Sequence, residues 1–175
     1  MQSRRDFYRI GSYMLGGLMS FGLSIPGVAY VLDPLRRKSG SGTTQELVRL
    51  SELEEGVPRS FPIVDERRDA WVKYPREPVG TVWLVRQPEG SASPVVAFTA
   101  ACPHLGCPIS LAAEGRSFTC HCHQAKFDLE GKPLNLVAPR GMDALKVELT
   151  GGDDPGVVVH FQRFRTQTKE PTPLV

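Results

Sequence analysis

The chain has 175 residues, of which 41% are hydrophobic, enough for about one domain with an appendage. Its formal net charge is only +2, and it lacks the basic face or stripe that binds nucleic acid, so we expect no nucleic-acid partner. The charge is uneven: residues 1–42 carry six basic and two acidic groups, and residues 43–175 carry fifteen basic and seventeen acidic groups.

The N-terminal region combines an export motif with an apolar segment. Residues 3–7 read SRRDF, which matches the S-R-R-x-F core of a twin-arginine signal; a chance arginine pair beside a membrane helix is the simpler alternative. Residues 10–32 are 23 residues without a charge, and a membrane-spanning helix needs about 20. A cleaved signal peptide is the other alternative, but the run is longer than a usual h-region and no clear A-x-A site follows it.

We therefore expect residues 1–38 to be a twin-arginine signal and an uncleaved membrane anchor, with the N-terminus in the cytoplasm. Residues 39–44 read SGSGTT, a composition typical of flexible linkers, and we place a hinge at residues 39–46. Residues 45–55 are ambiguous, because their leucines fit a short helix, whereas an edge strand with a turn ending at Gly56 fits equally well.

The rest of the chain consists of short runs rich in β-branched and aromatic residues, bounded by Pro or Gly, which is typical of strands. We expect strands at residues 60–64, 81–86, 95–100, 117–119, 126–129, 144–149 and 157–164. The predicted fold class is all-β, built from small antiparallel sheets. His160 alternates with apolar residues in the last strand, so we interpret it as structural rather than as a ligand.

The most specific signal lies in two cysteine- and histidine-rich boxes. Residues 102–107 read CPHLGC and residues 120–127 read CHCHQAKF, so all four cysteines and three of the four histidines lie here. The pattern is C-x-H, a loop, then C-x-x-H, with one further cysteine in each box. Two thiolates and two imidazoles from two loops can hold one metal centre, and they are the ligand set of a Rieske [2Fe–2S] cluster.

Three other interpretations fit less well. A Cys₂His₂ zinc site has the right ligand types but normally shows C-x₂₋₄-C spacing, and it would leave two cysteines unused. Two plain disulfides would leave the flanking histidines unexplained. A plant-type ferredoxin requires C-x₄-C-x₂-C spacing, and the second step is missing here.

The two boxes resemble those of the Rieske iron–sulfur subunits of quinol:cytochrome c (or plastocyanin) oxidoreductases, which typically read C-T-H-L-G-C and C-P-C-H-G-S-x-Y. The resemblance implies one [2Fe–2S] cluster with two cysteine ligands on one iron and two histidine ligands on the other, namely Cys102, Cys120, His104 and His123. It also implies that the two remaining cysteines, Cys107 and Cys122, form a disulfide between the boxes.

The same resemblance implies a Rieske head at residues 47–175, with a cluster-binding subdomain at about 98–142 inserted between strands of a base. Both ligand histidines would lie near the surface at its tip. His123 would contact a quinol and accept its proton, with His104 as the second functional histidine. Residues 137–141 are similar to the proline-rich loop that covers the cluster in this family.

The implied function is electron transfer within a membrane complex. The chain would be one subunit, inactive alone, of a quinol:cytochrome c reductase with a cytochrome b subunit, a c-type cytochrome and a membrane quinol, in a dimeric assembly. It would lie in the inner membrane with its head on the periplasmic side, swinging on the hinge. The alternatives are a Rieske small subunit of a periplasmic molybdenum oxidase such as arsenite oxidase, and a membrane-tethered zinc module without redox activity.

Three positions depart from the family pattern in a way that matters chemically. Gln124, Ala125 and Phe127 stand where the family has Gly, Ser and Tyr. In the family, that Ser and Tyr donate hydrogen bonds to sulfur, which stabilise the reduced cluster and raise its potential. Their absence predicts a low-potential cluster suited to menaquinol, unless the Gln124 amide supplies a substitute donor.

Overall fold

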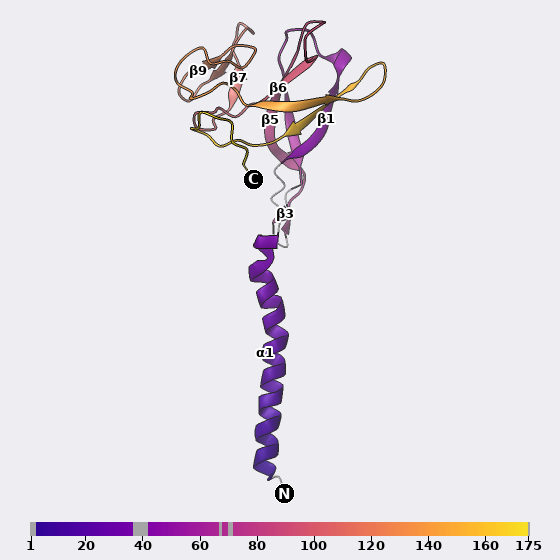
Figure 1. The fold of residues 1–175 in the computed structure, drawn as a ribbon, viewed down its shortest axis with the longest axis vertical. Helices are drawn as coiled ribbons and strands as arrows, with labels where there is room; N and C mark the ends of the chain where they lie inside the picture. Colours follow the sequence, from indigo (N-terminus) through magenta and orange to yellow (C-terminus); the bar gives the residue numbers. More distant parts are fainter. Residues whose placement is uncertain (1–2, 37–41, 67, 70–71, 175) are drawn as a thin grey trace. The chain divides into compact units, whose positions relative to one another are not determined.

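The computed structural model describes residues 3–36, 42–66, 68–69 and 72–174, which form two compact units. One unit is built on the helix α1 (Arg4–Arg36), and the other contains every strand of the two larger sheets. Figure 1 shows the helix in indigo to purple and the strands of the second unit in purple, magenta and orange. The strands confirm the predicted all-β class with one N-terminal apolar helix.

The helix α1 begins at a capping box. The Ser3 hydroxyl accepts the Asp6 N–H at 3.3 Å, and the Asp6 carboxylate in turn accepts the Ser3 N–H at 3.3 Å and the Ser3 hydroxyl at 2.8 Å. These bonds satisfy N–H groups that the first turn leaves without a helical partner. From Arg4 to Asp33 the mean hydropathy reaches 1.6, and the helix is long and apolar enough to cross a membrane.

The base of the second unit is a six-stranded antiparallel sheet in the order β1-β11-β10-β6-β5-β2. Its strands are β1 (Thr43–Arg49), β2 (Arg59–Asp65), β5 (Glu77–Arg86), β6 (Val95–Thr99), β10 (Ala144–Leu149) and β11 (Gly156–Phe161). A short 3₁₀ helix (Leu50–Glu52) follows β1, and β3 (Arg68–Asp69) pairs with β4 (Val72–Lys73) as a separate ribbon. The sheet curls so that its edge strands β1 and β2 meet. At this contact the Gln45 carboxamide oxygen on β1 accepts the Val64 N–H on β2 at 3.3 Å.

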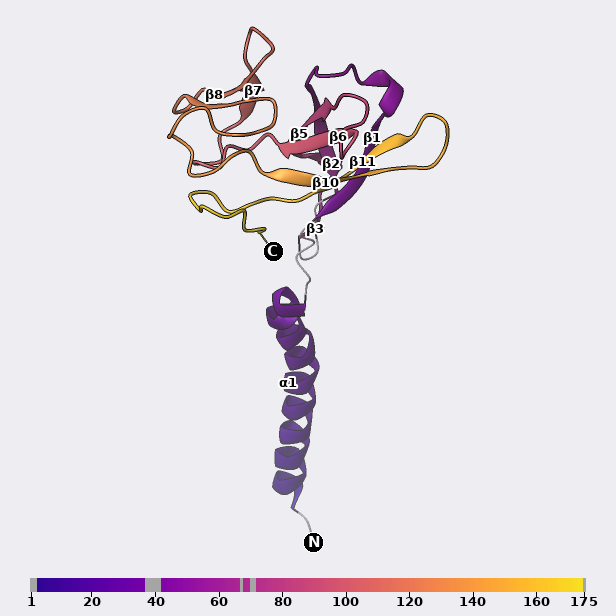
Figure 2. The same cartoon turned by 45° about the horizontal axis from the view of Figure 1, so that its top comes forward.

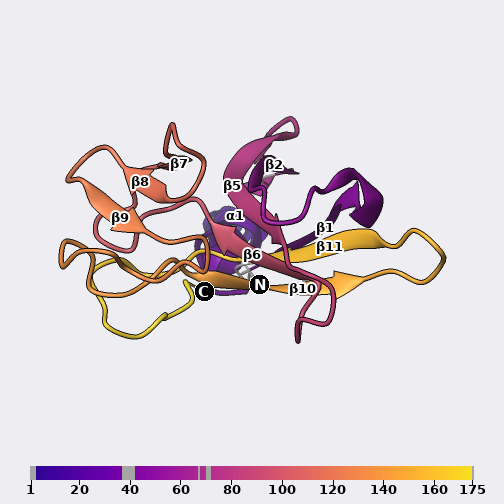
Figure 3. The same ribbon diagram turned by 90° about the horizontal axis from the view of Figure 1, so that it is seen from above.

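The strands β5 and β6 separate two hydrophobic cores. Side chains alternate between the faces of a strand, so Val82 and Leu84 of β5 enter the core of the base, whereas Val85 enters a second core. That second core belongs to a smaller sheet of three short strands, β7 (Ile109–Leu111), β8 (Phe118–Cys120) and β9 (Ala125–Phe127). Figures 2 and 3 show this sheet beside the base, on the side of β5 and β6.

A tryptophan links the base to the smaller sheet. Trp83 on β5 donates its indole N–H to the Ile109 carbonyl at 3.0 Å, and its ring lies 5.3 Å from the ring of Phe118. The smaller sheet is therefore fixed to the base, and its strands lie between β6 and β10 in the chain.

The structure revises the expectations for the first part of the head. Residues 43–46, which the composition placed in the hinge, are paired with β11 as part of β1. The ambiguous residues 45–55 form the edge strand, followed by the 3₁₀ turn, and not an α-helix. The rest of the predicted hinge, residues 39–41, lies outside the described residues.

Candidate metal centre

The first box folds into a tight turn at the end of β6. The Cys102 N–H donates to the Cys107 carbonyl at 2.8 Å, and the Gly106 N–H donates to the Cys102 carbonyl at 2.7 Å. Gly106 has a φ of 79°, a left-handed conformation that glycine adopts without steric cost. This turn directs Cys102 inward and leaves His104 half-buried at its outer side.

The second box is the turn of the β8–β9 hairpin. Cys120 ends β8 and pairs with Ala125, the first residue of β9, so the residues 121–124 form the turn. Gln124 closes it with a φ of 60°, which is uncommon for a residue with a side chain. The Asn135 side chain donates to the Gln124 carbonyl at 2.7 Å and holds the turn from outside.

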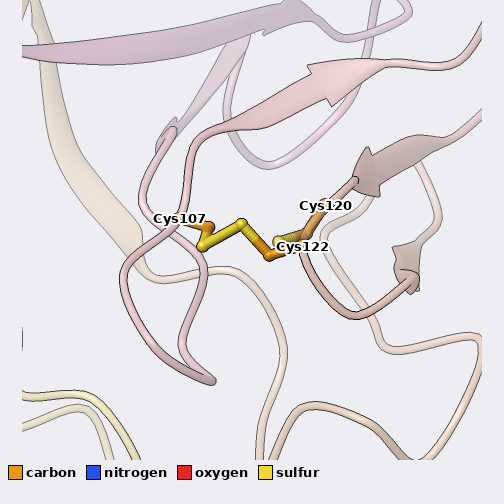
Figure 4. Close-up of side chains that lie close together, drawn as sticks. All are labelled: Cys107, Cys120 and Cys122. Carbon is orange, nitrogen blue, oxygen red and sulfur yellow. A yellow bond between two sulfur atoms is a disulfide. The ribbon is translucent and has the colours of Figure 1, made fainter.

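A disulfide between Cys107 and Cys122, with sulfur atoms 2.16 Å apart, joins the two boxes. This is the pair that the family resemblance implies. Figure 4 shows the bond, with Cys120 beside it at the start of the second turn. The three sulfur atoms of Cys107, Cys120 and Cys122 lie within 4.8 Å of one another, but only Cys120 among them retains a free thiol.

The two free cysteines, Cys102 and Cys120, are each 1% exposed. Burial raises the pKa of the Cys102 thiol to about 11; the backbone N–H of His104 opposes this, and the neighbouring Cys120 sulfur adds to it. A metal must therefore displace protons from a buried thiol pair when it binds. The fold therefore offers a metal two neighbouring cysteine sulfur atoms within an apolar core.

Two of the three histidines of the boxes, the predicted ligands His104 and His123, face each other. The ring centroids of His104 and His123 lie 4.7 Å apart, with the rings nearly perpendicular. His123 is exposed and His104 is half-buried. The two boxes thus supply two buried thiols and two facing imidazoles, which fit the cysteine-plus-histidine ligand set of a Rieske cluster, so the residues present are suited to that group.

The positions that depart from the family pattern are also defined. Ala125 and Phe127 are fully buried in the core around Cys102 and Cys120, and neither carries a hydroxyl group. The Gln124 side chain is exposed and its amide donates to the His121 carbonyl at 3.3 Å. The Gln124 amide therefore binds a backbone carbonyl in this structure. Its role as a substitute hydrogen-bond donor to the cluster stays a prediction.

His160 lies in the base sheet, with Nδ1 3.0 Å from the Thr44 hydroxyl and Nε2 3.3 Å from the Glu148 carboxylate, where it links neighbouring strands.

The backbone N–H groups of His104 and Leu105 donate to the Cys102 sulfur and lower the pKa of its thiol. The sequence carries no signal for these donors, because every residue except proline has a backbone N–H.

Comparison with known proteins identifies a family and several relatives. The Rieske [2Fe-2S] domain family matches residues 43–147. The chain is 27% identical over 132 residues to the menaquinol:cytochrome c reductase iron-sulfur subunit of Bacillus subtilis (strain 168), covering 74% of this chain and 75% of that protein. It is 25% identical over 156 residues to the same-named subunit of Geobacillus thermodenitrificans, covering 86% of this chain and 88% of that protein.

Among solved structures, the cyanobacterial plasma membrane Rieske protein PetC3 from Synechocystis PCC 6803 is 29% identical. The similarity covers 47% of this chain and 79% of that chain, with a TM-score of 0.37.

Proposed function

Because the chain belongs to the Rieske [2Fe–2S] domain family, we propose that it is the electron-transfer subunit of a membrane menaquinol:cytochrome c reductase. The observation that carries the proposal is that the same two boxes supply a pair of buried free cysteines, Cys102 and Cys120, and the facing rings of two histidines, His104 and His123. The two Bacillus and Geobacillus relatives bear that function in their names and match three quarters or more of their own length.

The four residues take separate roles in this proposal. Cys102, Cys120, His104 and His123 would hold the cluster, which would supply one-electron redox chemistry. The pocket around the cysteines is apolar and excludes water, whereas the histidines reach the surface. A substrate can therefore approach from the histidine side.

His123 is the proposed contact for the quinol. It is the more exposed of the two histidines, so one of its ring nitrogens is open to a ligand when the other binds metal. A deprotonated ring nitrogen accepts a hydrogen bond from a quinol hydroxyl and then its proton. Quinol oxidation at this site would move a proton to His123 as an electron leaves the quinol.

The rest of the assembly follows from the chemistry of a two-electron donor. One electron passes through this chain to a c-type haem, and the second needs a separate acceptor, which we assign to a b-type haem of a cytochrome b subunit. The sequence contains no C-x-x-C-H motif for covalent attachment of a c-type haem, and the proposal assigns both haems to partner subunits. A dimeric assembly remains part of the proposal.

The helix α1 is the proposed single-pass anchor. The SRRDF motif supports insertion with the N-terminus in the cytoplasm and the head on the outer side. The Ser3 and Asp6 of that motif also form the helix cap, so a structural role for Ser3 exists beside the signal. Replacing Arg4 and Arg5 by lysine should block export if the motif is read as a signal, and leave it unchanged if only the cap matters.

Purification from native membranes tests the function. A tagged chain isolated in detergent should bring b-type and c-type haems, identified by reduced-minus-oxidised spectra, and show a Rieske EPR signal. A molybdopterin protein without b-type haem would replace the proposal by the periplasmic oxidase alternative. A colourless preparation containing zinc would overturn the redox function altogether.

A further inference from the structure

The C-terminal segment, residues 163–174, folds into a small hairpin against the subdomain. The Arg165 N–H donates to the Thr172 carbonyl at 2.8 Å, and the Leu174 N–H donates to the Arg163 carbonyl at 2.7 Å. In the sequence, residues 166–175 are a polar, proline-containing tail that follows the expected strand at residues 157–164. The hairpin also lies beyond residues 43–147, the part that the Rieske family matches.

The side chain of Arg140, from the loop before β10, fills the centre of this hairpin. Arg140 and Asp143 form an ion pair with side chains only 7% and 4% exposed, through bonds of 2.7 and 2.8 Å. The same guanidinium donates to the Thr168 carbonyl at 2.6 Å, to the Thr168 hydroxyl at 2.9 Å and to the Arg165 carbonyl at 2.8 Å. These bonds use all five N–H donors of the guanidinium.

The opposite side of the hairpin contacts the first ligand box. The Gln167 N–H donates to the Pro103 carbonyl at 2.9 Å, between the candidate ligands Cys102 and His104. A side-chain carbon added at Gly106 would meet the Thr166 methyl at 3.7 Å, so the hairpin also lies against the end of the turn. Gln167 has a φ of 59°, a conformation that persists where the surroundings hold it.

We propose that Arg140 is a positioning residue for the cluster: through residues 163–174 it fixes the first ligand box, which carries Cys102 and His104. The path is continuous, from the Asp143 carboxylate to Arg140, from Arg140 to Thr168 and Arg165, and from Gln167 to Pro103. The inference rests on the proposed function, because it assumes that the first box holds a metal cluster.

The chemistry explains why arginine occupies this position. Its planar fork reaches the carboxylate on one side and two backbone carbonyls on the other, which the single ammonium of lysine cannot do. The Arg140→Lys variant can therefore keep the ion pair with Asp143 while releasing the hairpin. Thr168→Val removes the hydroxyl that accepts from Arg140 and donates to the Glu170 and Arg165 carbonyls, and it leaves the ion pair untouched. Lys169→Ala changes an exposed residue of the same hairpin outside these contacts and is the matched control.

Amide hydrogen exchange of the full-length, cluster-containing protein in detergent, read by mass spectrometry, tests whether the two segments are linked. We expect Arg140→Lys to accelerate exchange of residues 163–174 and of residues 102–107 at least about tenfold, which corresponds to about 1.4 kcal/mol. The strand β5 should keep its protection. Thr168→Val should produce the same pattern more weakly, and Lys169→Ala should produce none of it.

A general loss of stability is distinguished by the cluster itself. Arg140→Lys should release the cluster several-fold faster, followed by visible absorbance, and should shift the midpoint potential of the intact cluster relative to Lys169→Ala. Faster exchange of residues 163–174 with unchanged residues 102–107, cluster release and potential would overturn the proposal. Equal acceleration in β5 would overturn it also, and if Arg140→Lys does not fold, Thr168→Val decides by the same criteria. A native protein without any Rieske EPR signal would instead defeat the proposed function.

Discussion

The base sheet and the cluster-binding subdomain are held together by different forces. Six strands of five to ten residues each form the base around a largely aliphatic core. The subdomain has three strands of three residues each, and two candidate metal ligands are part of its core. Other links that hold it include the disulfide, the Arg140–Asp143 pair and the bond from Trp83.

This difference predicts which region depends on the metal. Strand ladders and apolar burial stabilise the base without any cofactor. A three-residue strand makes too few ladder bonds to be stable alone, so the subdomain must draw its stability from its apolar core, from cross-links and from the bound cluster. Variants at the candidate site should therefore affect the subdomain and leave the base folded.

The largest expected effect comes from removing one candidate ligand. Cys120→Ala should abolish the Rieske EPR signal, because one iron loses a thiolate that the fold places beside Cys102. Hydrogen exchange should rise throughout residues 102–127, whereas β5 and β11 keep their protection. His160→Gln is the control, since His160 lies in the base sheet; it should retain a full cluster. A normal EPR signal in Cys120→Ala would remove Cys120 from the ligand set.

Loss of the disulfide should come next. Replacing Cys107 and Cys122 together by alanine opens a link with a sequence separation of 15, and a loop of that size is worth about 3 kcal/mol. In guanidinium titrations, loss of visible absorbance should move to lower denaturant while the far-UV transition of the base moves less. Treatment of the unsubstituted protein with a thiol reductant should reproduce the shift. Equal movement of both transitions would mean that the base and subdomain unfold as one unit.

A smaller change concerns the cluster potential. Ala125 pairs with Cys120 across the β8–β9 ladder, so a hydroxyl placed there by Ala125→Ser lies next to a candidate ligand. A hydrogen bond that favours the reduced state by about 1.4 kcal/mol raises a one-electron potential by about 59 mV. Ala125→Ser with Phe127→Tyr should therefore raise the midpoint potential in an EPR titration, with Lys126→Gln on the same strand as the control. No rise would exclude the missing hydroxyls as the cause of a low potential.

The sequence predicted the regions in which local pattern and structure agree. Strands such as β5 and β11 have the alternation and β-branched content that the fold requires, and the boxes of the candidate site have distinctive spacing. The composition predicts a hinge over the first part of β1, because residues 43–46 are small or polar. Their strand conformation comes from pairing with β11, more than a hundred residues away. A short stretch of sequence does not show long-range strand pairing of this kind.

The C-terminal hairpin was missed for the same reason. Residues 163–174 have no hydrophobic periodicity, and their conformation depends on the Arg140 guanidinium, which lies more than twenty residues earlier in the chain. The sequence also gives no indication of the backbone N–H groups that donate to the Cys102 sulfur. Candidate ligands can therefore be proposed from sequence motifs, whereas the contacts around those residues cannot.

The smallest expected effect compares the two turns that carry the ligands. Each turn contains one left-handed residue, Gly106 in the first box and Gln124 in the second. A side chain in that conformation costs about 1–2 kcal/mol, partly offset because glycine loses more entropy on folding. Gln124→Gly should therefore stabilise the subdomain by about 0.5–1 kcal/mol, and Gly106→Ala should destabilise it by a similar amount, measured by visible absorbance in guanidinium. Destabilisation by Gln124→Gly would show that the bond from the Gln124 amide to the His121 carbonyl outweighs the backbone strain, and that the second turn depends on this side chain.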